Sequence, residues 1–305
     1  MNDETKGVLA MIGACTIWGL SGMYYKVLDH VPPVEILSHR TFWGLVFFLA
    51  VLAFQGRLRA LPNAIRTPRT FGIVAIAAFV ISLNWFVFIT SIHLGHATEA
   101  SMGYYIFPLV AVLAGAVFYK EKLNRPQLVS VALAALAVTI LSVGLQVAPW
   151  VALVLALSFA AYGVVKKSLA TGPVVSVTAE VLLLSPFAVA WLAVIHTQGN
   201  GHFGEDGMTT LMLMFAGVIT AIPLILFSYA TRRVSLATVG LVQYLNPTLQ
   251  FLVATLVFRE VFTLWHAIAF ALIWTALAIY TATSLRRGRA ARRAARAAGT
   301  SGTAL

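Results

Sequence analysis

The sequence predicts an all-α integral membrane protein with ten transmembrane helices, arranged as two inverted five-helix repeats. Of its 305 residues, 60% are hydrophobic and only 10% are charged, whereas soluble domains average about 25% charged residues. Apolar runs of about 20 residues recur along the whole chain, and each is long enough to cross a hydrocarbon core of about 30 Å. One sequence pattern also occurs twice at a constant spacing, which indicates an internal repeat.

The ten apolar runs are the expected helices, and short connections separate them. Proline or glycine marks many of these connections: Pro32-Pro33, Pro62 and Pro68, Pro126, Pro149, and Gly172-Pro173. The last three runs follow the polar loop 197–208, the basic pair Arg232-Arg233, and Arg259-Glu260. The expected bounds are 7–28, 34–55, 70–92, 98–119, 126–145, 148–168, 173–196, 209–230, 236–258 and 263–285.

The positions of Lys and Arg predict how the chain crosses the membrane. With the N-terminus in the cytoplasm, all but three of the 21 Lys and Arg residues lie in cytoplasmic segments, as the positive-inside rule requires. The exceptions are Lys26 and Arg40, which fall inside spans, and Arg259, which falls in an outward loop. The outward loop 196–207 is acidic and contains neither Lys nor Arg. Both termini are therefore expected in the cytoplasm.

The repeated pattern consists of an aromatic residue, a proline, and an apolar run closed by an aromatic, a basic residue and Glu. Each of its features recurs after 139 residues: Tyr105 and Tyr244, Pro108 and Pro247, Glu121 and Glu260. Because five spans is an odd number, the second half must enter the membrane from the opposite side, as in transporters with inverted repeats. We therefore expect one repeat over 7–145, a second over 148–285, and a basic cytoplasmic tail over 286–305.

The formal net charge of +11 does not indicate nucleic-acid binding, because the basic residues follow the membrane topology. The run Arg286 to Arg296 is read as a topological anchor that contacts anionic lipid. The single cysteine, Cys15, rules out an intramolecular disulfide. No cofactor is expected, and the sequence leaves open whether the protein forms a homodimer through lipid-facing helices.

Pro108 and Pro247 are the expected hinges. A proline within a span frees a backbone carbonyl one turn earlier, and lipid cannot satisfy that carbonyl. The mirrored positions favour two hinges that border a central pocket. The alternative is that both kinks only shape helix packing.

Ionisable residues within spans are functional candidates because burying a charge in lipid is costly. Arg40 is expected about 10 Å below the outer surface, and its counterpart Glu180 about as deep from the inner side, so we do not expect them to pair. Two interpretations stay open: an ion-pair network that closes the outer mouth, and a substrate or proton site. The candidates for gating and charge recognition are Lys26, Glu35, His39, Arg40, Glu99 and Glu180.

Aromatic and amide side chains gather at the middle depth of several spans. Such groups can line a substrate pocket, although amides also bridge membrane helices as packing contacts. The candidate substrate-binding residues are Trp18, Asn84, Trp85, Tyr105, Gln243, Tyr244 and Asn246.

Two short motifs are interpreted as incidental. Gly199 to Gly204 matches G-x-G-x-x-G, but it lies in an outward loop without the strand and helix of a dinucleotide site. His93, His96 and Glu99 have tolerable metal-ligand spacing, yet the expected role is that of interfacial polar residues. No catalytic triad order, P-loop or C-x-x-C pair appears, so we expect no enzyme. The alternatives are a membrane-embedded enzyme that uses this trio and a non-transporting membrane factor.

The combined motifs resemble the drug/metabolite transporter superfamily, and each half resembles an EamA domain of the RarD subgroup. The resemblance covers about residues 7 to 285. It rests on Ile17-Trp18-Gly19, the run Glu35 to Arg40, Asn84-Trp85, the run Glu99 to Pro108, Ala161-Tyr162-Gly163, and the run Leu241 to Thr248.

This resemblance implies an inner-membrane permease. We expect a secondary transporter that moves a small organic metabolite or drug by alternating access. One departure from the family pattern is Phe107-Pro108, where the first half usually has Asn-Pro; only the second half keeps the asparagine, Asn246. A role that requires two symmetric asparagines is therefore not expected here.

Overall fold

The computed structural model describes residues 3–120, 124–145, 149–167, 169, 171–231, 233–234, 239 and 242–300, with the backbone alone at 112, 115, 118–119, 145, 167, 231 and 284–300. Within these parts all regular secondary structure is helical, apart from one isolated bridge between Phe203 and Asp206. The helices are α1 (Asp3–Val27), α2 (Pro33–Phe54), α3 (Ala60–Ala64), α4 (Pro68–His93), α5 (Ala97–Tyr119), α6 (Arg125–Leu145), α7 (Trp150–Lys167), α8 (Pro173–Thr197), α9 (Gly207–Thr231), α11 (Leu245–Leu252), the π-helical turn η1 (Val253–Val257) and α12 (Leu264–Thr300).

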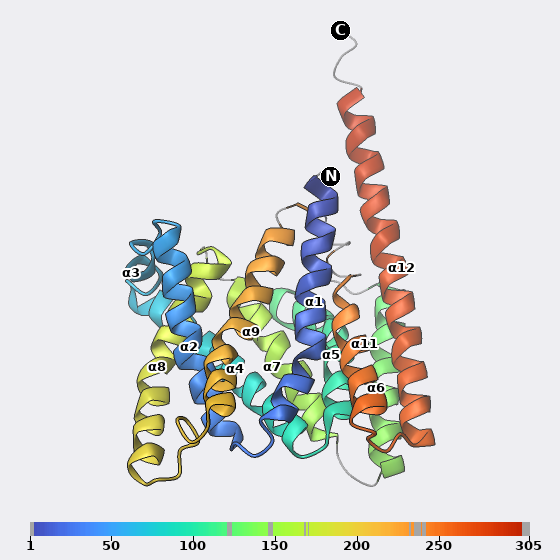
Figure 1. The fold of residues 1–305 in the computed structure, drawn as a ribbon. Helices are drawn as coiled ribbons and strands as arrows, with labels where there is room; N and C mark the ends of the chain where they lie inside the picture. Colours follow the sequence, from blue (N-terminus) through green and yellow to red (C-terminus); the bar gives the residue numbers. More distant parts are fainter. Residues whose placement is uncertain are drawn as a thin grey trace.

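The expected membrane fold is confirmed as an all-helical, multi-pass arrangement (Figure 1). Seven described helices are long and apolar enough to cross a membrane, and two shorter apolar helices cover Trp150–Lys166 and Leu245–Val257. A helix lies at each of the ten expected places, but within the described residues fewer than ten of these helices are long and apolar enough to cross a membrane. The short helix α3 was not expected.

Local sequence explains where several helices begin. Pro33 and Pro173 stand in the first turns of α2 and α8, where a proline lacks an N–H that would have no partner anyway. Thr67 and Thr70 form a reciprocal capping box at the start of α4, which satisfies two backbone donors of the first turn.

The helices of the two repeats pack against each other in a symmetric pattern. Taking α1, α2, α4, α5 and α6 as the counterparts of α7, α8, α9, α11 and α12, every main contact has an equivalent. The helix α5 packs on α7 as α11 packs on α1, and α4 packs on α7 as α9 packs on α1. The remaining pairs, α2 with α8, α5 with α11, and α6 with α12, join each helix to its own counterpart. This pattern is that of a two-fold arrangement of the halves.

The repeated pattern has the same backbone conformation at its end in both copies. Lys120 and Arg259 are 139 residues apart, and both have φ of 55°, a left-handed conformation that non-glycine residues seldom adopt. Such a residue commonly ends a helix. Glu121 lies outside the described residues.

The middles of the two copies differ. Pro108 lies inside the continuous helix α5. The expected span 236–258 is interrupted, because Tyr244 forms a turn and Pro247 falls in the first turn of α11. A proline cannot donate a backbone hydrogen bond and its ring clashes with the carbonyl four residues earlier, so a helix that restarts just before Pro247 avoids both penalties.

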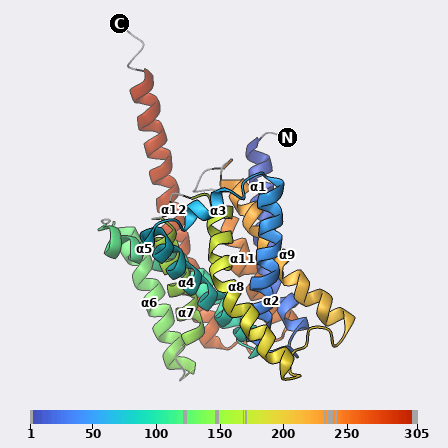
Figure 2. The same cartoon turned by 90° about the vertical axis from the view of Figure 1, so that its left-hand side faces the viewer.

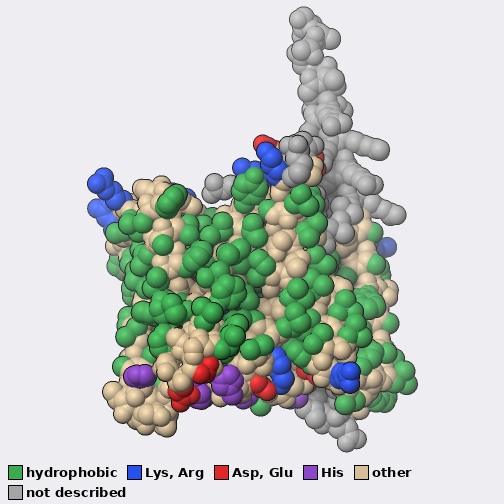
Figure 3. Space-filling model, viewed as in Figure 1, with side chains coloured by type: hydrophobic (Ala, Val, Ile, Leu, Met, Phe, Trp, Pro, Cys, Tyr) green, Lys and Arg blue, Asp and Glu red, His purple; other side chains and the backbone are tan. Residues whose placement is uncertain are grey.

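Charged side chains separate onto two opposite faces of the bundle (Figure 3). We call the face with Lys6, Arg57, Arg59, Arg66, Arg69 and Arg125 the basic face. The opposite face, called the histidine-rich face, has the other helix ends and carries His30, His93, His96, His196 and His202 with Asp29 and Glu205, together with the basic residues Lys26 and Arg259. Between them the visible surface is mostly hydrophobic. The helix α12 runs beyond the other helices on the side where α1 begins (Figures 1 and 2).

Candidate functional site

Arg40 is a buried cation in the second turn of α2. Only 7% of the surface of Arg40 is exposed. The guanidinium Nη1 donates a hydrogen bond to the hydroxyl of Tyr25 on α1 at 2.5 Å. Its central carbon lies 4.2 Å from the centroid of the Trp85 ring on α4. Arg40 forms no ion pair with any carboxylate that the structure describes.

Asn84 lies beside Trp85 on α4 and is 1% exposed. Its amide nitrogen donates to the carbonyl of Leu155 at 3.0 Å and to the hydroxyl of Ser158 at 2.9 Å. Its amide oxygen accepts from the hydroxyl of Tyr104 at 3.0 Å. The side chain thus joins α4 to α5 and α7, and its donors are fully used by the protein.

On the histidine-rich face, Glu35 and His39 have opposite hydrogen-bonding states. Glu35 is 1% exposed, and both carboxylate oxygens accept from His202, one from its backbone N–H and one from its ring, each at 2.8 Å. His39 stacks on Phe203 with ring centroids 5.0 Å apart. Its ring lies 3.9 Å from the Glu35 carboxylate, and neither ring nitrogen hydrogen-bonds to a described group.

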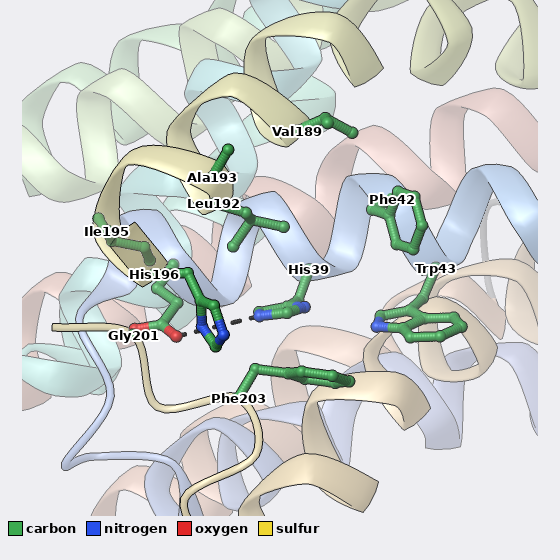
Figure 4. A pocket seen from close by; sticks show the side chains of 11 residues that line it. His39, Phe42, Trp43, Val189, Leu192, Ala193, Ile195, His196, Gly201 and Phe203 are labelled. Carbon is green, nitrogen blue, oxygen red and sulfur yellow. Dashed lines mark ion pairs between the residues drawn. The ribbon is translucent and has the colours of Figure 1, made fainter. Parts of the chain in front are cut away.

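A pocket of about 300 Å³ lies between α2, α8 and the loop that contains Phe203. Figure 4 shows His39, Phe42 and Trp43 on one side of it and α8 side chains, including Leu192, on the other. The indole N–H of Trp43 also has no described partner. The pocket is therefore lined largely by apolar and aromatic side chains, with Glu35, His39 and His196 at its wall, the composition of many small-molecule sites.

The other expected gating residues on this face form short-range pairs. Lys26 binds Asp29 at 2.8 Å, and Asp29 also lies 3.3 Å from His93. His96 and Glu99 are joined at 2.9 Å. The trio with metal-ligand spacing is thereby divided between two pairs, and no group of three or more metal-ligating side chains occurs among the described residues.

Glu260 forms a contact between the repeats that the sequence analysis did not assign. Its carboxylate accepts from the backbone N–H of Ala97 and Thr98, each at 2.7 Å, and from the Thr98 hydroxyl at 2.6 Å. The end of η1 is thereby attached to the beginning of α5, so these two copies run antiparallel. The aromatic-basic-Glu ending of the repeat is the signal that could have indicated it.

Glu180 lies on α8, toward the basic face. It is 1% exposed and accepts hydrogen bonds from Lys166 at 2.5 Å, Tyr162 at 2.9 Å and Ser176 at 3.0 Å. Lys166, which was expected in a cytoplasmic connection, belongs to α7 and is the counter-charge of Glu180. The expected lack of a pair between Arg40 and Glu180 agrees with these contacts.

The remaining candidate residues do not meet at one point through the described contacts. Tyr105 bonds to Thr248 at 2.7 Å and packs edge-on against Phe270 of α12. Tyr244 is partly buried against the hydrophobic cluster that contains Tyr105 and Phe270. The other three are placed as follows: the Trp18 ring lies 5.9 Å from that of Phe227, the Asn246 oxygen accepts from Gln250 at 3.1 Å, and Gln243 is partly buried.

The comparisons with known proteins bear on the whole chain. The model of the EamA-like transporter family matches residues 5–143 and 147–282. An uncharacterized transporter of Vibrio cholerae is 40% identical over 295 residues, covering 96% of this chain and 97% of the relative. The protein RarD of Streptomyces exfoliatus is 41% identical over 95% of this chain and 93% of its own length. RarD of Escherichia coli is 36% identical over 90% of this chain and 93% of its own length.

A solved crystal structure has a TM-score of 0.58 at 18% sequence identity, covering 92% of this chain and 98% of that one. At this identity the likeness concerns the fold alone. The sequence matches, by contrast, extend over nearly all of the helical bundle. The chain belongs to the EamA-like transporter family, in the subgroup that contains these RarD proteins, and is a multi-pass membrane transporter.

Proposed function

We propose that this protein is a secondary transporter that carries a small organic solute across the bacterial inner membrane by alternating access. The observation that carries the proposal is the symmetric packing of the two halves: each main helix contact between them has an equivalent with the roles of the halves reversed. In addition, α5 runs antiparallel to α11 and η1. Inverted repeats of this kind can rock against each other around a central site. In this proposal the repeats comprise 7–145 and 148–285, and the basic face lies in the cytoplasm.

The pairs on the histidine-rich face support a gate on the outer side. Glu260 attaches η1 to α5, and Glu35 holds the loop of His202 against α2. Both contacts join elements from different repeats, so opening this side requires that they break. Lys26, His39 and Glu99 complete the proposed gate, while Pro108 and Pro247 are the proposed hinges.

The substrate site is proposed between this outer gate and the inner-side residue Glu180. Arg40 and Trp85 supply charge and aromatic surface from the first repeat, and Trp18, Tyr105, Gln243, Tyr244 and Asn246 supply the rest of the lining. Asn84 supports this site by holding α4, α5 and α7 together, because its hydrogen bonds go to protein groups.

Uptake and efflux by purified protein in proteoliposomes, with a panel of radiolabelled metabolites, test the function. We expect at least one solute to move faster than in empty vesicles, and Tyr244→Ala to slow it roughly tenfold. A matched control is Phe187→Ala, because Phe187 is 76% exposed on the outside of α8. If no solute of the panel moves, or if Tyr244→Ala transports like the control, the function or its site is wrong.

Energy coupling has a separate test. Glu180 is the residue proposed to bind and release the coupling proton on the inner side, because its carboxylate is buried beside Lys166 and Tyr162. We expect Glu180→Gln to abolish accumulation driven by a pH gradient while solute exchange continues. Accumulation by Glu180→Gln at the wild-type level would exclude Glu180 as the coupling group.

A further inference from the structure

Arg40 stands apart from the buried Glu35 and Glu180 because it forms no ion pair with any carboxylate in the described part of the chain. The chain has ten Asp and Glu residues, and nine of them lie in the described parts. The two buried ones are committed elsewhere, Glu35 to His202 and Glu180 to Lys166. The half-buried Glu260 is bound to the start of α5. A buried charge in a membrane protein is costly unless it is paired.

The hydrogen bonds of the guanidinium leave one defined edge free. Nη1 donates to Tyr25. Nε has no partner among the described residues although it is fully buried, and no described group accepts from Nη2. In an arginine, Nε–H and the Nη2–H beside it point the same way and form the side-on fork that binds both oxygens of a carboxylate. Most buried polar groups in proteins have a hydrogen-bond partner, so this edge of Arg40 is a place where a ligand could supply one.

The aromatic surroundings restrict how a ligand can approach Arg40. Trp85 covers one face of the guanidinium at 4.2 Å. The Tyr25 ring centroid lies 5.9 Å from the guanidinium carbon, and the Tyr25 hydroxyl occupies the Nη1 side. With the Nη1 side and one face taken, the direction left for a planar oxyanion is in the guanidinium plane, toward the Nε and Nη2 edge.

We propose that the Nε and Nη2 edge of Arg40 binds the carboxylate of the transported solute, so that the substrates are small organic anions or zwitterions. This inference rests on the proposed transport function and names its substrate class. The carboxylate supplies the negative charge that the described residues do not provide. Trp85 then stacks beside the ion pair and excludes water from it.

The first test is ligand-dependent thermal unfolding of the purified full chain in detergent. The probes are acetate, lactate, benzoate and indole-3-acetate, each compared with its uncharged amide. We expect at least one carboxylate to raise the Tm by a few degrees at saturation, and its amide to have no effect. If none of the four acids stabilises the wild-type protein more than its amide, the inference is overturned, whatever the variants do.

Variants then assign the effect to Arg40. Arg40→Lys keeps the charge and loses the fork, so we expect carboxylate affinity to fall roughly 10-fold; Arg40→Gln should lower it roughly 100-fold. The matched control is Arg233→Gln, because Arg233 also stacks on a tyrosine, Tyr229 at 3.5 Å, but is exposed on the basic face. An unchanged carboxylate shift in Arg40→Lys and Arg40→Gln would overturn the assignment.

Transport in proteoliposomes separates failure of this inference from failure of the proposed function. Movement of uncharged solutes, without any response to carboxylates, would retain the transporter and refute the anion site. Carboxylate binding that depends on Arg40, without movement of any solute, would retain the site and refute transport. A structural role for Arg40 alone predicts a lower Tm of unliganded Arg40→Gln and no difference between acid and amide.

Discussion

At the scale of single residues, the polar groups within this bundle differ in whether the protein satisfies them. Asn84 uses both amide protons and its oxygen in contacts with three residues on α5 and α7. Arg40 leaves its Nε without a described partner. In a medium without water each unmade hydrogen bond is costly. Asn84 therefore contributes to helix packing, whereas the unpartnered Nε of Arg40 is the basis of the proposed ligand site.

Replacement of Asn84 by Leu should destabilise the protein. The change removes three hydrogen bonds and leaves the Tyr104 hydroxyl without its acceptor. Because membrane hydrogen bonds contribute about 0.6 kcal/mol on average, we expect a loss of about 1–3 kcal/mol, seen as a lower Tm in detergent. The double variant with Tyr104→Phe should lose less than the sum of the single changes. Full additivity would show that the Tyr104 contact is absent in solution.

At the scale of helices, the halves are joined at the histidine-rich face by a carboxylate on a helix start. Free backbone N–H groups at an N-terminus attract anions. Glu260 occupies two of them at the start of α5. Glu260 lies at the end of the repeated pattern, directly after Arg259, whose backbone is left-handed. From this position its side chain reaches from the second repeat to the first.

Glu260→Gln should weaken this attachment and open the outer side more often. The glutamine amide keeps one acceptor oxygen and replaces the other by an NH2 group that cannot accept, so the bonds to one oxygen are lost. The bonds that remain become neutral and are roughly half as strong. We expect a cysteine introduced as Thr98→Cys to react severalfold faster with a membrane-impermeant thiol reagent when Glu260 is also Gln. The native Cys15 is fully buried, which keeps the background low. Equal rates in the presence and absence of Glu260→Gln would contradict a gating contact.

Close packing of α5 on α7 depends on Gly103. A Cβ at this position would lie 2.8 Å from the carbonyl oxygen of Ala152 and 3.0 Å from its Cα, and backbone atoms cannot move aside cheaply. We expect Gly103→Leu to prevent stable folding or to lower the free energy of unfolding by about 3 kcal/mol. The control is Gly163→Leu on α7, where nothing lies within 4 Å. Similar thermal unfolding of both variants would show that the helices do not approach this closely.

At the scale of the whole molecule, charge is separated between the two faces while the repeats are related by symmetry (Figure 3). The symmetry governs helix packing, but the charges do not follow it, because Lys and Arg gather at the basic face, which the proposed function places in the cytoplasm. Equivalent positions can therefore carry opposite charges, as at Arg40 and Glu180, which are 140 residues apart.

The basic end of the chain provides a test of this orientation. The backbone of α12 continues as a helix to Thr300, and its arginines should contact anionic lipid at about 1 kcal/mol each. Substitution of all six arginines between 286 and 296 by Gln should reduce flotation of the protein with anionic vesicles at low salt. Transport in neutral proteoliposomes should not change. Equal flotation of both proteins would remove the lipid-anchor role.

Much of the fold could be predicted from the sequence because its signals are local. The length of each apolar run places a helix, and the 139-residue spacing places the repeats. The interruption at Tyr244 was not predicted, because a proline is compatible with a continuous span, as Pro108 shows in α5. Whether a helix continues past a proline depends on its neighbours, which are distant in the sequence.

For the candidate site, the sequence by itself determined which residues bear charge inside the spans, since hydropathy and residue type suffice for that. Only the tertiary structure decided what each charge does. Glu35 and Arg40 stand five residues apart on α2, yet Glu35 is paired with His202 and Arg40 has no described carboxylate. The partner of Glu35 comes from 167 residues away. Because the electrostatic cost of a buried charge depends on atoms within a few ångströms, the unpartnered Nε of Arg40 becomes visible only in the folded protein.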